Sequence, residues 1–324
     1  MSEHSTRDSE RTTRRGFLER VALGAATPML AACAASLASS AIGGEAAGKL
    51  AFQPDGSAFS FDTGDLKGVL RGEGKSRGLL PASHVATGKS LAKSLGLFSH
   101  YRLLDDANRY GPAGWDWNSS ASLTPNGAVE VSWTRDDVHP FDMHAVYRFT
   151  AADTLDLETG IRAGRELKRF EVFLASYFDG FARSFAMVKD GSKPRFDEAK
   201  QSDAVWHMYP RDAGAVAMIQ DGRWKRPPNP VDWTIRPELA GACAVRRDEE
   251  TGLTAVLMAR PADCFAIAMP FGEETHRSVY FSLFGKDLRE GETVKAKTRL
   301  VIRPKLSDEA VVAIYEEFLQ ASRN

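Results

Sequence analysis

Histidine and glutamate side chains are the candidates for acid and base chemistry in this chain. A histidine titrates near neutral pH, and a nearby carboxylate can serve as its proton partner in general acid and base catalysis. The candidate catalytic residues are, in chain order, His100, His144, Glu171, His207 and Glu238. The alternative for each of them is a structural role, and for Glu238 that role is an ion pair with Arg236 or a nearby lysine.

Tryptophans and arginines gather in two segments rich in proline and glycine, 105–120 and 223–237. Four prolines in the second segment exclude a central strand, and long loops in a compact β domain are often functional. Aromatic rings pack against the apolar faces of sugar rings, while forked guanidinium groups bind hydroxyls. The predicted binding set is Tyr101, Arg109, Trp115, Trp117, Tyr177, Trp206, Arg211, Trp224, Trp233 and Arg236. The alternative is that these rings close the ends of a hydrophobic core.

Recognisable cofactor motifs are lacking. The chain has no His-Glu-x-x-His spacing and no closely spaced cysteine pair, so we predict no cofactor, although ligands far apart in the sequence leave a divalent metal ion open. Segments 72–75 and 87–90 carry only fragments of a phosphate-loop pattern and are interpreted as turns.

Alternation with a period of two is the dominant pattern along the chain. In 141–149 the large apolar side chains share one face of the predicted strand, and segment 155–161 repeats the pattern after a turn at 151–153, which predicts a hairpin. Further strands are predicted at 68–70, 129–133, 169–178, 215–220, 278–284 and 294–302.

The number of short strands separated by Asp-Gly, Asn-Gly and Glu-Gly turns predicts an all-β fold. We expect a single large antiparallel β-sandwich domain over 45–324, with one helix at 307–322 that is capped by Ser307 and presents an apolar stripe.

The strand sequences resemble the galactose-mutarotase-like supersandwich superfamily, whose members include sugar epimerases, polysaccharide lyases and glycoside hydrolases. The similarity covers the segments 147–149, 154–158, 170–178, 278–285 and 288–292. It implies a carbohydrate-active protein acting by acid and base chemistry, with a non-catalytic glycan-binding module as the alternative. Ala175 occupies the position where mutarotases carry a catalytic histidine, which argues against the simple mutarotase mechanism.

Charge and cysteine content narrow the function further. The chain has 42 basic and 43 acidic residues, a balance that gives no field to attract nucleic acid.

Three segments, 242–245, 253–258 and 264–268, are predicted as consecutive strands of a meander, which would hold Cys243 and Cys264 too far apart for a disulfide. We therefore expect two free thiols, with a disulfide as the alternative.

The N-terminal segment resembles a twin-arginine signal sequence. Arg14 and Arg15 precede an apolar, alanine-rich stretch, so residues 1–40 are predicted to direct export through the Tat machinery to the periplasm or cell envelope. The run ending at Cys33 resembles a lipobox, which predicts a lipid anchor to the membrane at that cysteine; cleavage after Ser40 is the alternative.

Overall fold

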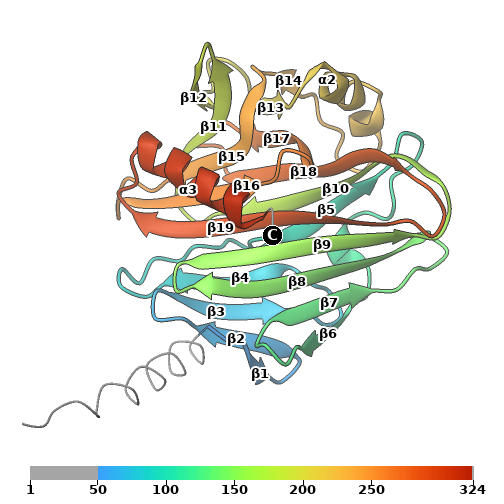
Figure 1. Ribbon diagram of the computed structural model, residues 1–324, viewed down its shortest axis with the longest axis horizontal. Coiled ribbons are helices and arrows are strands. Elements are labelled where there is room, and N and C mark those ends of the chain that lie inside the picture. The colour runs from blue at the N-terminus through green and yellow to red at the C-terminus, as the bar shows by residue number, and fades with distance from the viewer. Residues whose placement is uncertain (1–49, 323–324) are drawn as a thin grey trace, which may run out of the picture. The chain divides into compact units, whose positions relative to one another are not determined.

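The computed structural model describes residues 50–322, which form three β-sheets (Figure 1). The predicted export motif at Arg14 and Arg15 and the predicted lipidation site at Cys33 lie outside the described residues. Every strand pair within the sheets is antiparallel except the short parallel pair of β13 (Trp206–Pro210) and β14 (Thr234–Ile235).

The largest sheet has nine strands in the order β12-β11-β15-β16-β19-β9-β8-β7-β6. Its strands are β6 (Ser120–Leu123), β7 (Val129–Trp133), β8 (Phe141–Ala151), β9 (Thr154–Ala163), β11 (Arg183–Asp190), β12 (Lys193–Glu198), β15 (Leu239–Arg247), β16 (Leu253–Ala259) and β19 (Thr293–Pro304).

The second sheet has six strands in the order β14-β13-β17-β18-β10-β5. These are β5 (Ser99–Leu104), β10 (Leu167–Tyr177), β13 (Trp206–Pro210), β14 (Thr234–Ile235), β17 (Cys264–Pro270) and β18 (Ser278–Leu288). The third sheet is formed by β1 (Gln53–Asp55), β2 (Ala58–Asp62), β3 (Leu66–Arg71) and β4 (Gly78–His84).

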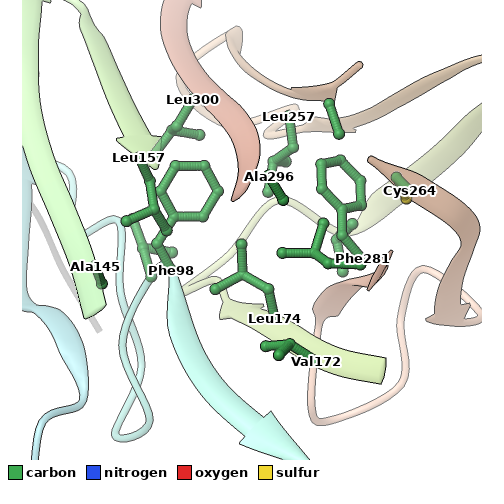
Figure 2. Close-up of a cluster of buried hydrophobic side chains, with 14 of the residues drawn as sticks. Phe98, Ala145, Leu157, Val172, Leu174, Leu257, Cys264, Phe281, Ala296 and Leu300 are labelled. Atoms are coloured by element: carbon green, nitrogen blue, oxygen red, sulfur yellow. The ribbon is translucent and has the colours of Figure 1, made fainter. Parts of the chain in front are cut away.

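The main hydrophobic core lies between the nine-stranded and six-stranded sheets. Leu157 and Leu300 from the larger sheet and Leu174 and Phe281 from the smaller one belong to this core and are buried (Figure 2). Burial of apolar side chains between two facing sheets defines a β-sandwich. The predicted fold class, a large antiparallel β-sandwich with a C-terminal helix, is confirmed.

The predicted hairpin and terminal helix are also confirmed. β8 pairs with β9, and the alternate residues Phe141 to Phe149 face the core. Helix α3 (Asp308–Ala321) begins after Ser307, whose side chain accepts a hydrogen bond from the Ala310 N–H. The apolar stripe of α3 packs on the outer face of the nine-stranded sheet, where Tyr315 and Phe318 are buried.

The predicted strand at 215–220 is wrong, because this segment is helix α2 (Ala213–Ile219). Asp212 caps the helix by accepting a hydrogen bond from the Ala215 N–H at 2.9 Å. Ala215, Met218 and Ile219 are buried at helical spacing, although the small alternating residues imitate a strand. The cap and this spacing are the signals that identify the helix.

The predicted meander of three consecutive strands is wrong in its last step. β15 and β16 pair as expected, but β17 crosses to the six-stranded sheet and pairs with β13 and β18. Both faces of β16 and β17 are fully buried, so alternation does not distinguish the sheets. Cys243 and Cys264 are buried free thiols, as expected.

None of the helices in residues 50–322 is long and apolar enough to cross a membrane.

Candidate functional site

The outer face of the six-stranded sheet carries a second hydrophobic cluster that is rich in aromatic residues. Along β10, Val172 and Leu174 point into the main core, whereas the alternate residues Phe173 and Tyr177 belong to this outer cluster. We call this surface the aromatic face, and its mutually contacting rings are Tyr101, Trp115, Phe173, Tyr177, Trp224, Trp233 and Tyr280.

The rings of the aromatic face form a connected layer. Trp115 stacks on Tyr101 with ring centroids 4.6 Å apart and planes 5° apart. Phe173 stacks on Tyr280 at 4.6 Å, and Trp224 contacts Phe173 edge-on at the same distance. Phe173, Trp224 and Tyr280 are buried, whereas Tyr101, Trp115 and Trp233 are partly exposed, so an apolar floor lies beneath more accessible rings.

A short turn brings Trp115 onto this face. Trp115 lies in η1 (Gly114–Asp116), which follows β5 in the chain. A Cβ atom at Gly114 would lie 2.7 Å from the carbonyl oxygen of His100, so the close approach of this turn to β5 requires glycine.

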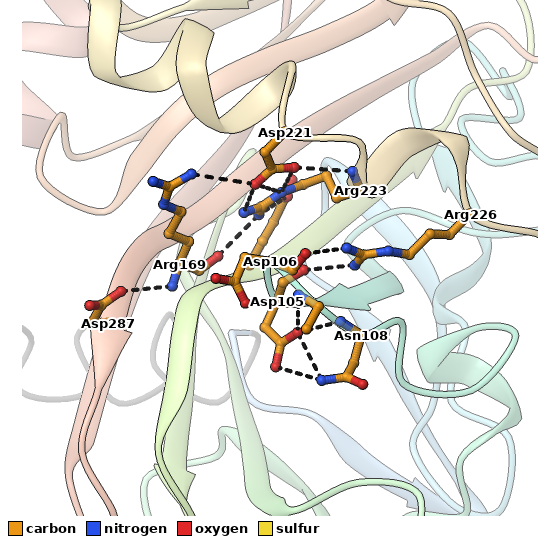
Figure 3. A network of polar contacts seen from close by, with 10 residues as sticks. Asp105, Asp106, Asn108, Arg169, Asp221, Arg223, Arg226 and Asp287 are labelled. Carbon is orange, nitrogen blue, oxygen red and sulfur yellow. Dashed lines mark hydrogen bonds and ion pairs between the residues drawn. The ribbon is translucent and has the colours of Figure 1, made fainter.

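A buried ion pair attaches the second loop to β10. Arg223 in η2 (Arg223–Lys225) donates to Glu171 Oε2 at 2.9 Å. It also donates to Asp221 Oδ2 at 2.8 Å (Figure 3). Arg223 and Glu171 have no exposed side-chain surface. The pair therefore fixes the start of the loop that carries Trp224 and Trp233.

Three arginines hold the following proline-rich segment through backbone carbonyls. Arg102 donates to the Asn229 carbonyl at 2.6 Å, and Arg109 donates to the carbonyl of Pro228. In the other direction, Arg226 donates to the Asp105 carbonyl at 3.0 Å and to that of Asp106 (Figure 3). The two predicted loops, 105–120 and 223–237, are thereby joined beside the aromatic face.

Several polar atoms at this site are buried without a hydrogen-bond partner in the described part of the chain. They are Nε and Nη1 of Arg102, Nε of Arg109, and the indole Nε1 atoms of Trp224 and Trp233. Buried donors are nearly always satisfied in folded proteins. A concentration of unsatisfied donors beside aromatic rings is typical of a binding site.

The hydroxyl groups of Tyr177 and Tyr280 lie side by side on the same face. Tyr280 donates to the Tyr177 oxygen at 3.3 Å. Burial raises the pKa of Tyr280 to about 12 and also raises the pKa of Tyr177. Both hydroxyls are therefore neutral near pH 7 and can donate or accept hydrogen bonds.

The predicted catalytic residues do not come together. His100 lies between the sheets, where its Nε2 is 3.0 Å from Thr159 Oγ1, and burial lowers its pKa to about 3. His144 lies on the outer face of the nine-stranded sheet, above Gly160 on β9. His100 therefore contacts the inner face of the nine-stranded sheet, whereas His144 lies on its outer face.

The other three predicted catalytic residues are also separate. His207 is buried beside Tyr209 on β13, and burial lowers its pKa. Glu238 forms an ion pair with Lys189 at 2.6 Å, which is the structural role considered as its alternative. Glu171 lies on β10 beside the aromatic face, where its carboxylate accepts a hydrogen bond from Arg223.

Most of the predicted binding residues do share one region. Tyr101, Trp115, Tyr177, Trp224 and Trp233 belong to the aromatic face. Trp206 and Arg109 adjoin it: the Trp206 ring is 5.9 Å from that of Trp233, and Arg109 donates to Pro228 in the loop.

Three predicted binding residues lie elsewhere. Trp117 is buried in the main core and stacks on His139 at 4.0 Å. Arg211 pairs with Asp212 at 2.7 Å, and Arg236 pairs with Asp203 at 2.9 Å. Each arginine therefore already has a carboxylate partner.

Sequence reasoning missed four notable residues. Tyr280 belongs to the aromatic face and Arg102 lies against its rings, but both are in strands with apolar neighbours, so no motif distinguishes them. His276 lies 5.8 Å from Trp206, and its Nδ1 is 2.8 Å from Glu274 Oε1. His139 forms a similar pair with Asp136 at 2.9 Å; the Asp-x-x-His spacing was the available signal.

Two hollows lie away from the aromatic face. One of about 310 Å³ is lined by Phe318 and by the ion-paired Asp156 and Arg299. Another of about 400 Å³ is lined by Trp117 and His139. A Cβ at Gly111 would approach His139 Nε2 to 3.1 Å, so the backbone there closes off this nitrogen. Residues 50–322 contain no group of three or more potential ligands arranged to hold a metal ion.

Comparisons with known proteins give similarity at the level of fold. No family model matches the chain, and no curated protein matches it. Among solved structures, the Slr1438 protein from Synechocystis sp. PCC 6803 is similar at 8% identity and a TM-score of 0.48, covering 78% of this chain and 94% of its own.

Two further solved structures have names that refer to sugars. A GalM/aldose epimerase homologue from C. elegans has 10% identity and a TM-score of 0.44, covering 79% of this chain and 98% of that one. The alpha-N-acetylgalactosaminidase NagBb from Bifidobacterium bifidum has 11% identity and a TM-score of 0.48, covering 84% and 38%. At these identities the likeness concerns the fold alone.

Proposed function

We propose that this protein binds a saccharide on the aromatic face. The observation that carries the proposal is the combination of the Tyr101–Trp115 stack with buried, unpartnered donors on Arg102, Trp224 and Trp233. A sugar ring presents apolar C–H groups on its faces and hydroxyls at its edge. Aromatic rings and directed donors together match both parts of that ligand.

Binding is favoured over catalysis because the predicted acid and base residues are dispersed. His100 is neutral and enclosed, His144 is on another sheet, and Glu238 is paired with Lys189. General acid and base catalysis needs its groups within hydrogen-bond distance of one substrate.

A second candidate function is turnover of the bound saccharide. His276 and Glu274 adjoin Trp206, and a carboxylate bonded to Nδ1 leaves Nε2 of the imidazole to exchange a proton with a substrate. His276 remains about half exposed, so this nitrogen is on the rim and not in the core.

A glycan array combined with product analysis tests both candidates. Wild-type protein is expected to retain a subset of glycans, and Trp233→Ala to lose them, while Trp117→Phe, a change in the main core, retains them. Retention without products supports binding alone. Products that disappear in His276→Ala support turnover. Failure to retain or convert any glycan would overturn both proposals.

We propose further that the protein acts outside the cytoplasm, exported by the Tat machinery and anchored by a lipid on Cys33. Support comes from the Arg14-Arg15 pair followed by an apolar stretch and the lipobox-like run. In cell fractionation, replacing both arginines by lysine is expected to leave the protein in the cytoplasm. Cys33→Ser is expected to release exported protein from the membrane. Export of the double lysine variant would contradict the proposed Tat signal. Continued membrane attachment of Cys33→Ser would contradict the proposed lipid anchor.

A further inference from the structure

Two arginines beside the aromatic face have no acidic partner. Arg102 is 3% exposed and Arg109 is half-buried, yet their hydrogen-bond acceptors are the carbonyls of Asn229, Pro228 and Pro112. Within residues 50–322 neither guanidinium forms an ion pair with a carboxylate. A buried charge without a counter-ion is costly, so this arrangement reduces the stability of the free protein.

The other deeply buried arginines show how this chain normally satisfies such a group. Arg223 is neutralised by Glu171 and Asp221. The Nε, Nη1 and Nη2 atoms of Arg246 donate hydrogen bonds to the backbone carbonyls of Phe181, Ser278 and Gly272, respectively. Arg102 has neither solution, because two of its three nitrogens have no partner in the described chain.

The two guanidinium groups donate to the carbonyls of the adjacent residues Pro228 and Asn229, so two positive charges lie near each other. Burial and the positive charge of Arg102 lower the pKa of Arg109. The Arg102 guanidinium lies 5.1 Å from the ring centroids of both Tyr101 and Trp224, so this positive charge is set among the rings of the aromatic face. A pair of like charges at one place creates a local field that favours an anion.

Two acidic side chains in the adjoining segments, Asp105 and Asp232, are already engaged. Asp105 accepts hydrogen bonds from the backbone N–H groups of Ala107 and Asn108 and from the Tyr110 hydroxyl. Asp232 pairs with Lys225. Within the described chain, an anion supplied by a ligand would meet two arginines that donate to backbone carbonyls and have no carboxylate partner.

We infer that the ligand of the aromatic face is an anionic saccharide, whose carboxylate or ester sulfate or phosphate group binds Arg102 and Arg109. This inference rests on the proposed saccharide binding and adds the charge of the ligand to it. The anion takes the place of the Asn229 and Pro228 carbonyls, because a charge-assisted hydrogen bond to a guanidinium is stronger than one to a neutral carbonyl. The loop segment 227–230 moves when those two bonds are released.

Matched pairs of glycans test the inference. Each uronic-acid glycan on an array is compared with its carboxyl-reduced counterpart, and each sulfated or phosphorylated glycan with the form lacking that ester. We expect the retained glycans to be anionic, with an affinity at least about tenfold above that of the neutral counterpart, a ratio that decreases as salt is added. Inorganic sulfate alone is expected to give little thermal stabilisation, which distinguishes a sugar-borne anion from a free one.

Arginine variants make the test specific. Arg102→Gln and, as a milder change, Arg109→Gln are expected to lower affinity for the anionic glycan about tenfold more than they lower affinity for its neutral counterpart, because only the anion loses a charge-assisted hydrogen bond. Arg211→Gln, which alters an arginine paired with Asp212 away from the face, is the matched control. Thermal unfolding confirms that each variant is folded.

The outcomes separate the two proposals. Equal affinity for both members of each pair, with loss of binding in Trp233→Ala, would overturn the anionic ligand and leave saccharide binding intact. Equal loss of both glycans in the arginine variants would assign Arg102 and Arg109 a structural role and also overturn it. Equal stabilisation by inorganic sulfate would assign the site to a free anion, and retention of no glycan would overturn saccharide binding itself.

Discussion

The indole ring of Trp115 lies parallel to the phenol ring of Tyr101, with 4.6 Å between their centroids. Trp115 comes from η1 and Tyr101 from β5, and Gly114 at the start of η1 allows the close approach to His100. A parallel pair of partly exposed rings presents a flat apolar surface. Exposure of such a surface to water adds little to the stability of the folded chain.

Two replacements of Trp115 are expected to separate the contribution of ring stacking to glycan affinity from the contribution of apolar side-chain volume. Trp115→Leu keeps much of the apolar volume but removes the ring, and we expect about a tenfold loss of glycan affinity, equivalent to about 1.4 kcal/mol. Trp115→Phe keeps a ring and should remain within about threefold of wild type. Isothermal titration calorimetry measures both; equal affinities for Leu and Phe would show that the ring is not used.

The ion pair of Glu171 and Arg223 is expected to dominate the stability of the second loop. Glu171→Gln leaves Arg223 with Asp221 as its one carboxylate partner in the described chain, and we expect a loss of about 3 kcal/mol in the free energy of unfolding. Glu238→Gln, which breaks the exposed pair with Lys189, should cost less than about 1 kcal/mol. Denaturant titration compares them; similar costs would show that burial of the pair is unimportant.

His100 is expected to make stability depend on pH. Its pKa is about 3 in the folded protein and near its ordinary value of 6.5 when unfolded, so the unfolded chain binds the extra proton between these values. The stability that neutral His100 provides is complete above pH 6.5 and is lost as the pH falls toward 3. Relative to His100→Gln, wild type should lose about 2 kcal/mol between pH 7.5 and pH 5.

Urea titrations at the two pH values measure this difference directly. His276→Gln is the control, because that side chain is half exposed and lies outside the core. A constant difference between wild type and His100→Gln would mean that His100 titrates alike in the folded and unfolded chains.

The thiols of Cys243 and Cys264 are expected to be inert until the protein unfolds. Both are buried, and burial raises the pKa of Cys264 to about 12 and raises that of Cys243 as well. A thiol-reactive dye added to the Cys33→Ser protein should find no fast-reacting thiol in native buffer and two in guanidinium. Fewer than two after unfolding would indicate a disulfide.

The sequence was sufficient for elements whose residues alternate clearly. β8 and β9 were predictable because large apolar residues recur at every second position and a short turn separates them. Ser307 marked the start of α3. By contrast, β16 and β17 are buried on both faces, so their residues contain no signal that assigns them to one sheet or the other.

The candidate site was predictable in its aromatic part only. Trp115, Trp224 and Trp233 lie in loops whose composition marks them as ordered, whereas Tyr280 and Arg102 lie in strands and reach the same face through pairing with β10. Pairing between strands far apart in the chain is set by tertiary packing. The histidines were candidates for acid and base chemistry because of their residue type. Whether they come together depends on which face of which sheet each one occupies, and the sequence does not indicate this.

The dispersed origin of the aromatic face limits when it can exist. β10 is paired with β5, more than sixty positions earlier, and with β18, more than a hundred positions later, so its neighbours are complete only after most of the chain has been synthesised. Closing such long segments makes assembly slow. Ligand binding at this face would consequently report that the whole domain has finished folding, and a nascent or truncated chain would be unable to capture its ligand prematurely.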